Sequence, residues 1–180
     1  YEGLRGKLPE ATFVDGSGIV EWVRVIKSPE EIALMTRCAK MLDHGSRAGL
    51  DALRAGTTED AIAAEIHREL VGRGSEYPGL PHFVVSGPRI SVTHATWEGR
   101  KIAKGDPVFY ELSATKHRYS SAIMFTACDG EPGKRVRAMA DASLAALHAG
   151  MAALKPGVPC EEVDRVVHGE WVKAGFGEYH

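Results

Sequence analysis

The sequence has little of what marks secreted, membrane-spanning or nucleic-acid-binding proteins. Its three cysteines, Cys38, Cys128 and Cys160, lie far apart without a CxxC pair, which excludes a disulfide framework and a zinc knuckle and predicts buried free thiols. Lys and Arg number 22 against 24 Asp and Glu, for a net charge of -2, so we expect no nucleic-acid partner. No apolar run approaches the ~20 residues of a bilayer span, and no basic segment followed by an apolar core opens the chain. The sequence therefore predicts a soluble, cytoplasmic protein without a membrane partner.

What is present is the composition of a folded domain. Hydrophobic residues make up 44% and charged residues 26% of the 180 positions, which excludes a disordered or fibrous chain. A chain of this length buries about two-thirds of its unfolded surface, enough for a core of its own. It opens on Tyr1 rather than Met and stops at His180 without a tail-like composition. We therefore expect both ends to be cut from a longer protein.

Two helices are predicted in the first third of the chain. Residues 19–26 are rich in β-branched side chains and predict a strand that leads into the first helix. Ser28-Pro29-Glu30-Glu31 combines a capping serine, a proline at the first helical position and a glutamate at the third, which is a capping box. Apolar residues at helical spacing then extend the helix to about Leu53, and a second helix ends near Gly72.

A β-rich unit and a second pair of helices follow. Short β-rich runs are predicted at residues 83–86, 90–93, 108–113 and 119–128. The last two runs read as antiparallel strands joined by residues 114–118. Helical periodicity returns at residues 136–154 and again at 161–173.

The helix pairs form an internal repeat. Residues 52–56 match residues 153–157, and the offset of 101 positions holds without a gap as far as Gly74 and Gly175. The first helix pair is followed by the β-rich unit, whereas the chain stops soon after the second pair. We therefore expect one complete αα-β repeat followed by the helical part of a second, truncated one.

Two side chains in the β-rich unit are candidates for acid–base chemistry. His94 is flanked by small hydroxyl residues and can act as a proton shuttle, although a surface or hydrogen-bonded core histidine is the simpler interpretation of a lone histidine. Glu111 stands in the middle of an apolar strand, where an ionised carboxylate is costly unless it is paired. The alternation of the strand also allows an edge-strand glutamate that points to water.

Four further residues are candidates for substrate binding. Arg118 and Tyr119 begin the strand that pairs with the strand of Glu111, so we expect them near that carboxylate, where they can bind an anionic group. A charged hairpin loop with an aromatic cross-strand partner is the alternative interpretation. Arg89 and Trp97 come from the same polar segment as His94 and complete the set.

Several separated motifs resemble one family. Three motifs follow one another in the chain: the run from Arg24 to Ile32, Ser86-Gly87-Pro88 six residues before His94, and Gly105-Asp106 ahead of the strand with Glu111. In this order they resemble the motifs of the pita-bread hydrolases. This is the family of creatinase, prolidase and methionine aminopeptidase. The resemblance covers most of the chain and implies a fold with two pseudo-symmetric α/β halves, in agreement with the internal repeat.

The resemblance also implies a domain organisation. Residues 1–27 would be the end of a preceding N-terminal domain with its connecting strand. Residues 28–133 would form the first half of the catalytic domain, and residues 134–180 would begin the second half. The expected fold class is α/β (α+β), with the remaining catalytic residues beyond the end of this chain.

The match departs from the family at the metal site. The peptidases carry two aspartates on adjacent strands, which hold two divalent ions about 3.5 to 4 Å apart. His94 matches the family's substrate-side histidine, and Glu111 stands at the first aspartate position. The second position is Ala122, which cannot be a ligand, and Met124 and Phe125 replace the threonine and arginine that usually follow. The other family ligands, a histidine and two glutamates, would follow the end of the chain.

With these departures the sequence resembles the metal-free branch of the family, which includes creatinase and ectoine hydrolase. The resemblance predicts hydrolysis of C–N bonds in small zwitterionic compounds or peptides without a cofactor. Glu111 would activate water or attack the C–N centre, His94 would move the proton, and Arg118 or Tyr119 would hold a substrate carboxylate.

Two other functions stay open. The first is a metal-dependent Xaa-Pro aminopeptidase or dipeptidase, with Mn or Co bound in part by Glu111. The second is a non-catalytic binding or scaffold protein on the same fold, which Met124 and Phe125 favour. For the 180-residue chain alone we expect little or no activity, and we expect it to self-associate as a homo-oligomer, in the simplest case a homodimer.

Overall fold

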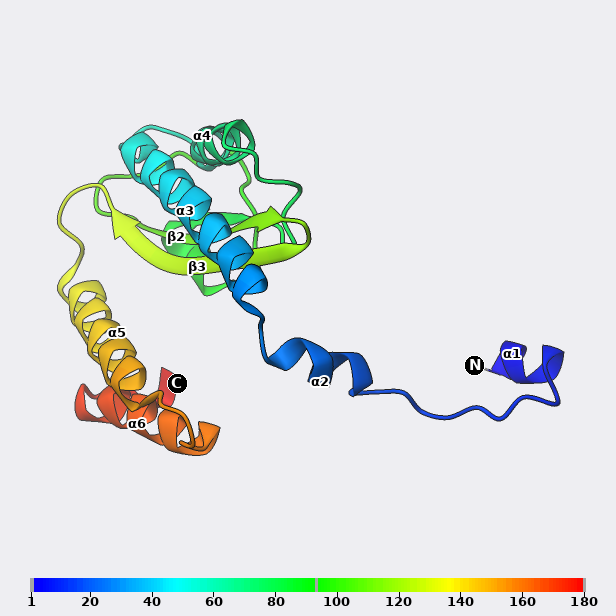
Figure 1. Ribbon diagram of the computed structural model, residues 1–180. Helices are drawn as coiled ribbons and strands as arrows, with labels where there is room; N and C mark the ends of the chain where they lie inside the picture. Colours follow the sequence, from blue (N-terminus) through cyan, green and yellow to red (C-terminus); the bar gives the residue numbers. More distant parts are fainter. Residues whose placement is uncertain (1, 93, 180) are drawn as a thin grey trace.

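The computed structural model describes residues 2–92 and 94–179, which combine helices with a small antiparallel sheet (Figure 1). The elements, in order, are α1 (Glu2–Lys7), α2 (Ile19–Val25), α3 (Pro29–Ala52), α4 (Glu59–Gly72), β1 (Phe83–Ser86), the 3-10 helix η1 (Gly87–Ser91), β2 (Pro107–Lys116), β3 (Tyr119–Cys128), α5 (Lys134–Ala153), α6 (Cys160–Lys173) and the 3-10 helix η2 (Gly177–Tyr179). The expected order, a helix pair, a β-rich unit and a second helix pair, is confirmed. The described part contains no helix that is long and apolar enough to cross a bilayer.

Side-chain caps begin both helices of the first pair. The Ser28 hydroxyl accepts the backbone N–H of Glu31 at 3.3 Å, and the Glu31 carboxylate accepts the N–H of Ser28 at 2.6 Å, so the predicted capping box is confirmed. In α4 the Thr58 hydroxyl accepts the N–H of Ala61 at 3.2 Å. These caps satisfy backbone donors that would otherwise lack partners at the helix start.

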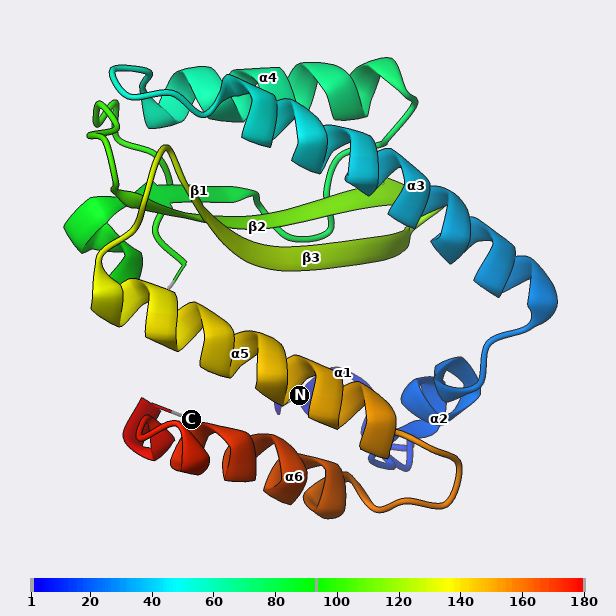
Figure 2. The same cartoon turned by 90° about the vertical axis from the view of Figure 1, so that its left-hand side faces the viewer.

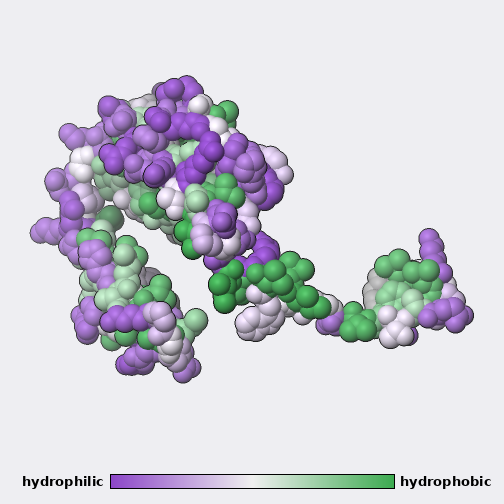
Figure 3. Space-filling view, in the orientation of Figure 1, coloured by the Kyte–Doolittle hydropathy of each residue, from purple (hydrophilic) through white to green (hydrophobic). Residues whose placement is uncertain are grey.

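The strand predicted at residues 19–26 is wrong, because this segment forms the short helix α2. Its first turn closes with a bond from the Trp22 N–H to the Gly18 carbonyl at 2.9 Å. Its β-branched side chains have no neighbouring strand to pair with in the described part of the chain, and strand preference depends on such packing. Figure 3 shows the result as an apolar surface on the arm that α2 forms, where Trp22 is 78% exposed.

The sheet has the order β1-β2-β3, with both pairs antiparallel. Strand β2 continues to Lys116, so the predicted connection of residues 114–118 shrinks to a two-residue turn at His117 and Arg118. Both turn residues have positive φ, 49° and 66°, which is the backbone that a tight hairpin requires. The β-rich run predicted at residues 90–93 is also wrong. Gly87 and Pro88 begin η1 in its place, and Thr93 lies outside the described residues.

The core lies between one face of the sheet and the helices α3 and α4 (Figure 2). Gly49 lets the two helices approach closely, because a Cβ there would lie 2.9 Å from Cδ1 of Ile66. Tyr110 on β2 stacks on Phe125 of β3 with ring centroids 4.7 Å apart. Of the thiols predicted to be buried, Cys38 is buried, whereas Cys160 is exposed. The opposite face of the sheet is turned away from α3 and α4.

The repeat inferred from the sequence has a structural counterpart. Helices α3 and α5 end at Ala52 and Ala153, and α4 and α6 span Glu59–Gly72 and Cys160–Lys173, each pair offset by 101 positions. The close helix approach is repeated as well, since a Cβ on Gly150 would lie 2.8 Å from Cγ2 of Val167. Gly150 and Val167 correspond to Gly49 and Ile66 at the same offset. The two helix pairs are therefore built by one packing rule.

Candidate active site

Glu111 lies on the face of the sheet that α3 and α4 do not cover. Side chains alternate along a strand, and β2 sends Val108, Tyr110 and Leu112 into the core. Residues directly opposite each other on antiparallel strands share a face. Glu111 is paired with Phe83 of β1 and Met124 of β3, so these three side chains lie in one row across the sheet.

The surroundings of Glu111 decide between its two interpretations. Strand β2 is the central strand of the sheet, and Glu111 is only 5% exposed. An edge-strand glutamate that points to water is therefore excluded. Within residues 2–92 and 94–179, no hydrogen bond or ion pair engages its carboxylate. A nearly buried carboxylate that no residue of 2–92 or 94–179 is seen to bind, next to Phe83 and Met124, is available for chemistry.

His94 reaches the same face from the segment that follows η1. Its ring lies against the ring of Phe83, with centroids 5.3 Å apart and an interplanar angle of 34°. The residue is exposed and has a φ of 58°, an uncommon backbone for a residue with a side chain. Phe83 thus contacts His94 through its ring and is the strand partner of Glu111. The two predicted catalytic residues are brought together on one face.

Ala122 occupies the position from which a second carboxylate would reach Glu111. It is paired with Ser113 on β2, and Met124 is paired with Glu111, so Ala122 is the diagonal neighbour of Glu111 at about 7 to 8 Å. An aspartate at this position would point to the same face. The described residues contain no group of three or more His, Cys, Asp or Glu side chains that could hold a metal ion. At this diagonal position the chain supplies a methyl group and no oxygen ligand.

The expectation that Tyr119 lies beside Glu111 is wrong. Tyr119 is the partner of Lys116, five residues along β2 from Glu111, which is about 17 Å at the usual rise of a strand. Its hydroxyl donates to the Glu31 carboxylate at 2.5 Å, at the beginning of α3. This bond raises the pKa of Tyr119 and lowers the pKa of Glu31. Tyr119 therefore connects the hairpin to the helix layer.

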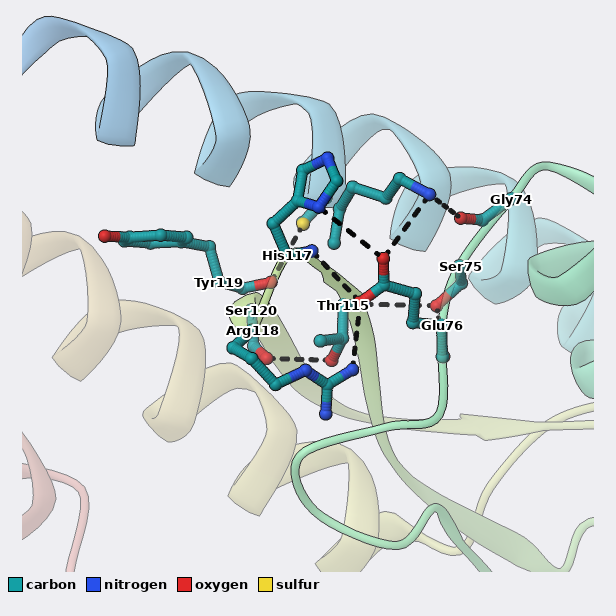
Figure 4. Close-up of polar contacts among 10 residues, drawn as sticks. Gly74, Ser75, Glu76, Thr115, His117, Arg118, Tyr119 and Ser120 are labelled. Carbon is teal, nitrogen blue, oxygen red and sulfur yellow. Dashed lines mark hydrogen bonds and ion pairs between the residues drawn. The ribbon is translucent and has the colours of Figure 1, made fainter.

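Arg118 is likewise held at the hairpin turn, away from Glu111. Figure 4 shows that its guanidinium points to Glu76, with Nη2 at 2.9 Å from the carboxylate, and its Cζ lies 3.7 Å from the centre of the Tyr77 ring. Glu76 also accepts the backbone N–H of His117 at 3.0 Å. These contacts, that of Arg118 foremost, lower the pKa of Glu76 to about 2. The alternative interpretation, a charged hairpin loop with an aromatic partner, describes the observed contacts.

Arg89 and Trp97 lie on the side of α4 and not beside Glu111. The Arg89 guanidinium pairs with Glu59 at 3.0 Å and with Glu98 at 2.8 Å. Trp97 packs against the core and meets His67 of α4 edge-to-face, with ring centroids 5.9 Å apart. Of the six predicted site residues, the structure therefore places only His94 and Glu111 on the open face.

Glu59, the first residue of α4, is not among the residues predicted from the sequence. Its side chain is completely buried and holds the segment that carries His94. An acidic residue just after a capping threonine is typical of an exposed first helical turn, so nothing in the sequence marks its burial. A faint signal is the number of polar residues between Ser86 and Arg100, which need internal partners once the segment folds back on α4.

His82, which precedes β1, is likewise not marked by any motif of the sequence. It is buried, and its Nε2 lies 2.7 Å from the Ser113 carbonyl, so Nε2 carries the proton and donates. Its Nδ1 lies 3.0 Å from Nε2 of His67. Burial lowers the pKa of His82. The residue is therefore a neutral link between α4 and the strand that carries Glu111.

Comparison with known proteins identifies the family. Residues 33–180 match metallopeptidase family M24. The chain belongs to metallopeptidase family M24. The resemblance inferred from the sequence motifs is thereby confirmed. The matched range includes the sheet and also the second helix pair, α5 and α6.

The relatives include an Xaa-Pro dipeptidase and an ectoine hydrolase. The chain is 31% identical to an Xaa-Pro dipeptidase from Lactobacillus helveticus over 181 residues, which cover 99% of this chain and 49% of that protein. It is 26% identical to an ectoine hydrolase from Halomonas elongata, covering 98% of this chain and 46% of that protein. The chain therefore spans about half the length of the curated relatives that it matches.

Solved structures agree on the fold. The prolidase from Pyrococcus horikoshii superposes with a TM-score of 0.93 at 26% identity, over 99% of this chain and 51% of that one. The prolidase from Pyrococcus furiosus gives a TM-score of 0.88, also at 26% identity, over 93% of this chain and 50% of that one. The predicted pita-bread architecture is confirmed.

Proposed function

We propose that the protein hydrolyses C–N bonds of small zwitterionic compounds or peptides without the two-metal centre of the M24 peptidases. The observation that carries the proposal is the pair of positions Glu111 and Ala122. One carboxylate stands on the open face, and its diagonal neighbour is a methyl group. The ectoine hydrolase among the relatives supports a small zwitterionic substrate.

The residues on the open face divide the chemistry between them. Glu111 takes a proton from the attacking water as the new C–O bond forms, and His94 gives a proton to the nitrogen as the C–N bond breaks. The carbon ends as a carboxyl or amide carbon and the nitrogen leaves as an amine, so protons and electron pairs balance. Phe83 and Met124, the strand partners of Glu111, flank the carboxylate on the same face of the sheet.

A metal-dependent Xaa-Pro dipeptidase is the second candidate. The 31% identity to the Lactobacillus helveticus enzyme favours it. Glu111 could supply one oxygen ligand to Mn or Co, but the described residues would supply no bridging partner. The residues that would complete such a site would come from outside this chain.

A substrate panel separates the candidates. The full-length protein should be assayed on proline dipeptides, creatine and ectoine, beside Glu111→Gln and the matched surface variant Glu131→Gln. We expect turnover of a zwitterionic compound that Glu111→Gln abolishes and Glu131→Gln leaves unchanged. Turnover of proline dipeptides alone would favour the second candidate, and binding without turnover would favour a scaffold. For the 180-residue chain alone we propose little turnover, since the Glu111 face is open.

A further inference from the structure

A single buried carboxylate joins the two ends of the segment that carries His94. Oε1 of Glu59 accepts the backbone N–H of Ser86 at 2.8 Å and the Ser86 hydroxyl at 2.7 Å. Oε2 accepts Nη1 of Arg89 and the backbone N–H of Glu98, both at 3.0 Å. His94 lies between Ser86 and Glu98 in the chain. Both ends of its segment are therefore tied to the same side chain.

A second layer of contacts fixes the partners of Glu59. The Ser86 hydroxyl, which donates to Glu59, accepts Nη1 of Arg100 at 2.7 Å, and Arg100 also pairs with Asp106 at 2.7 Å. Gly87 has a positive φ of 58° and lies directly under the guanidinium, since a Cβ on it would be 2.6 Å from Nη2 of Arg100, so a side chain here would strain the backbone and displace the guanidinium. Asp106 directly precedes β2, the strand of Glu111. The network thus joins α4 to the segment that carries His94 and to the residue that precedes the strand of Glu111.

The Arg89 side chain adds contacts within the segment that carries His94. Its Nη2 donates to the Thr96 carbonyl at 2.9 Å and pairs with Glu98 at 2.8 Å, and its Nη1 is held by Glu59. A buried charge is stable only when its partners are in place, because removal of one partner leaves an uncompensated ion. The Glu59 carboxylate therefore stabilises the conformation of residues 86–98 in which Ser86, Arg89 and Glu98 all donate to it.

We infer that Glu59 is a positioning residue for His94. Its carboxylate closes the segment between Ser86 and Glu98, and the closed segment keeps the imidazole against Phe83, the strand partner of Glu111. Glu59 itself does not touch substrate, because its side chain is completely buried. Only the catalytic consequence rests on the proposed function; the placement of His94 can be tested without it.

The test compares Glu59→Gln with Asp60→Asn in the full-length protein. Glutamine keeps the size of the side chain but presents an NH2 group to donors that need an acceptor. Asp60 is exposed one position further along the same helical turn, so Asp60→Asn is a matched control. The readouts are the nuclear Overhauser contact between the His94 and Phe83 rings and the amide hydrogen exchange of residues 86–98.

For Glu59→Gln we expect the ring contact to weaken and exchange in the segment to rise about tenfold or more, while amides of β2 keep their protection. Turnover on the substrate found for the wild type should fall about 100-fold, as for a misplaced catalytic group, with little change in KM. Asp60→Asn should match the wild type in every readout. Should Glu59→Gln fail to fold, Arg89→Lys, which keeps the charge but loses the forked contact, is expected to show the same loosening in milder form.

Wild-type ring contact and exchange in a folded Glu59→Gln protein would overturn the inference, as would equal loosening by Asp60→Asn. If the wild type is active and Glu59→Gln weakens the ring contact and raises exchange without lowering turnover, the claim that Glu59 affects catalysis is overturned. If the protein turns over no member of the substrate panel, the proposed function fails, and the ring contact and exchange still decide whether Glu59 positions His94.

Discussion

Phe83 and Glu111 are direct partners across β1 and β2, and the His94 ring lies against the Phe83 ring. Phe83 therefore contacts one candidate catalytic residue through its ring and is the strand partner of the other. This relationship gives Phe83 a role that its position in an apolar strand does not reveal.

Phe83→Leu should disturb the site more than the fold. Leucine keeps most of the apolar volume, so we expect a loss of about 1 kcal/mol in the free energy of unfolding, whereas Phe83→Ala should lose about 3 to 5 kcal/mol. Both variants remove the surface against which His94 lies. The measurements are urea unfolding and the histidine ring signals in NMR spectra. Unchanged His94 signals in Phe83→Leu would contradict this role.

The hairpin turn should lose stability in acid. The pKa of Glu76 is lowered to about 2 from its usual 4.5, chiefly by Arg118. A carboxylate with a depressed folded-state pKa stabilises the protein fully above its unfolded pKa, and that contribution is lost as the pH falls toward 2. We therefore expect the free energy of unfolding in urea to fall less for Glu76→Gln than for the wild type as the pH is lowered from about 5 to about 2. Glu65→Gln, at an exposed pair with Arg68, is the control and should behave like the wild type.

His82 should make the fold sensitive to mildly acidic pH. Burial is the main reason that its pKa lies below the usual 6.5. The unfolded chain then binds a proton that the folded protein does not, so stability is complete above pH 6.5 and declines as the pH falls below it. His82→Gln should flatten this decline in chemical unfolding, and the exposed His148→Gln should not. An identical pH dependence in all three proteins would show that His82 is not neutral in the fold.

Close helix packing predicts a large effect of one methyl group. Alanine at Gly49 would bring Cβ to 2.9 Å from the buried side chain of Ile66, and such overpacking costs about 1 to 3 kcal/mol. Gly72→Ala, where nothing lies within 4 Å, is the matched control and should be neutral or stabilising by up to about 1 kcal/mol. Thermal unfolding measures both. A Gly49→Ala protein as stable as Gly72→Ala would refute the packing described for α3 and α4.

Local signals predicted much of the fold. The capping box at Ser28 and the apolar spacing after it gave α3 to within one residue of its end, because both act through nearby backbone and side chains. The offset of 101 positions predicted the second helix pair. Residues 19–26 were misjudged because β-branched residues indicate a strand only where another strand can pair with them.

The site was less predictable, since it depends on which face a side chain takes. Glu111 and His94 stand in a recognisable order in the sequence and meet on one face. Tyr119 follows in the same order, yet the position of the turn at His117 sends its side chain to the helix layer. Glu59 could not be found at all, because its burial depends on a segment that folds back over α4 from 27 positions away.

The metal requirement of catalysis tests the central claim most directly. The full-length protein and Ala122→Asp should be treated with EDTA, dialysed, and assayed on the same substrate before and after addition of Mn or Co, with bound metal measured by atomic emission. We predict that the wild type keeps its full rate after EDTA and gains nothing from metal. Stoichiometric metal in the wild-type protein, with activity lost in EDTA and restored by Mn or Co, would contradict the account.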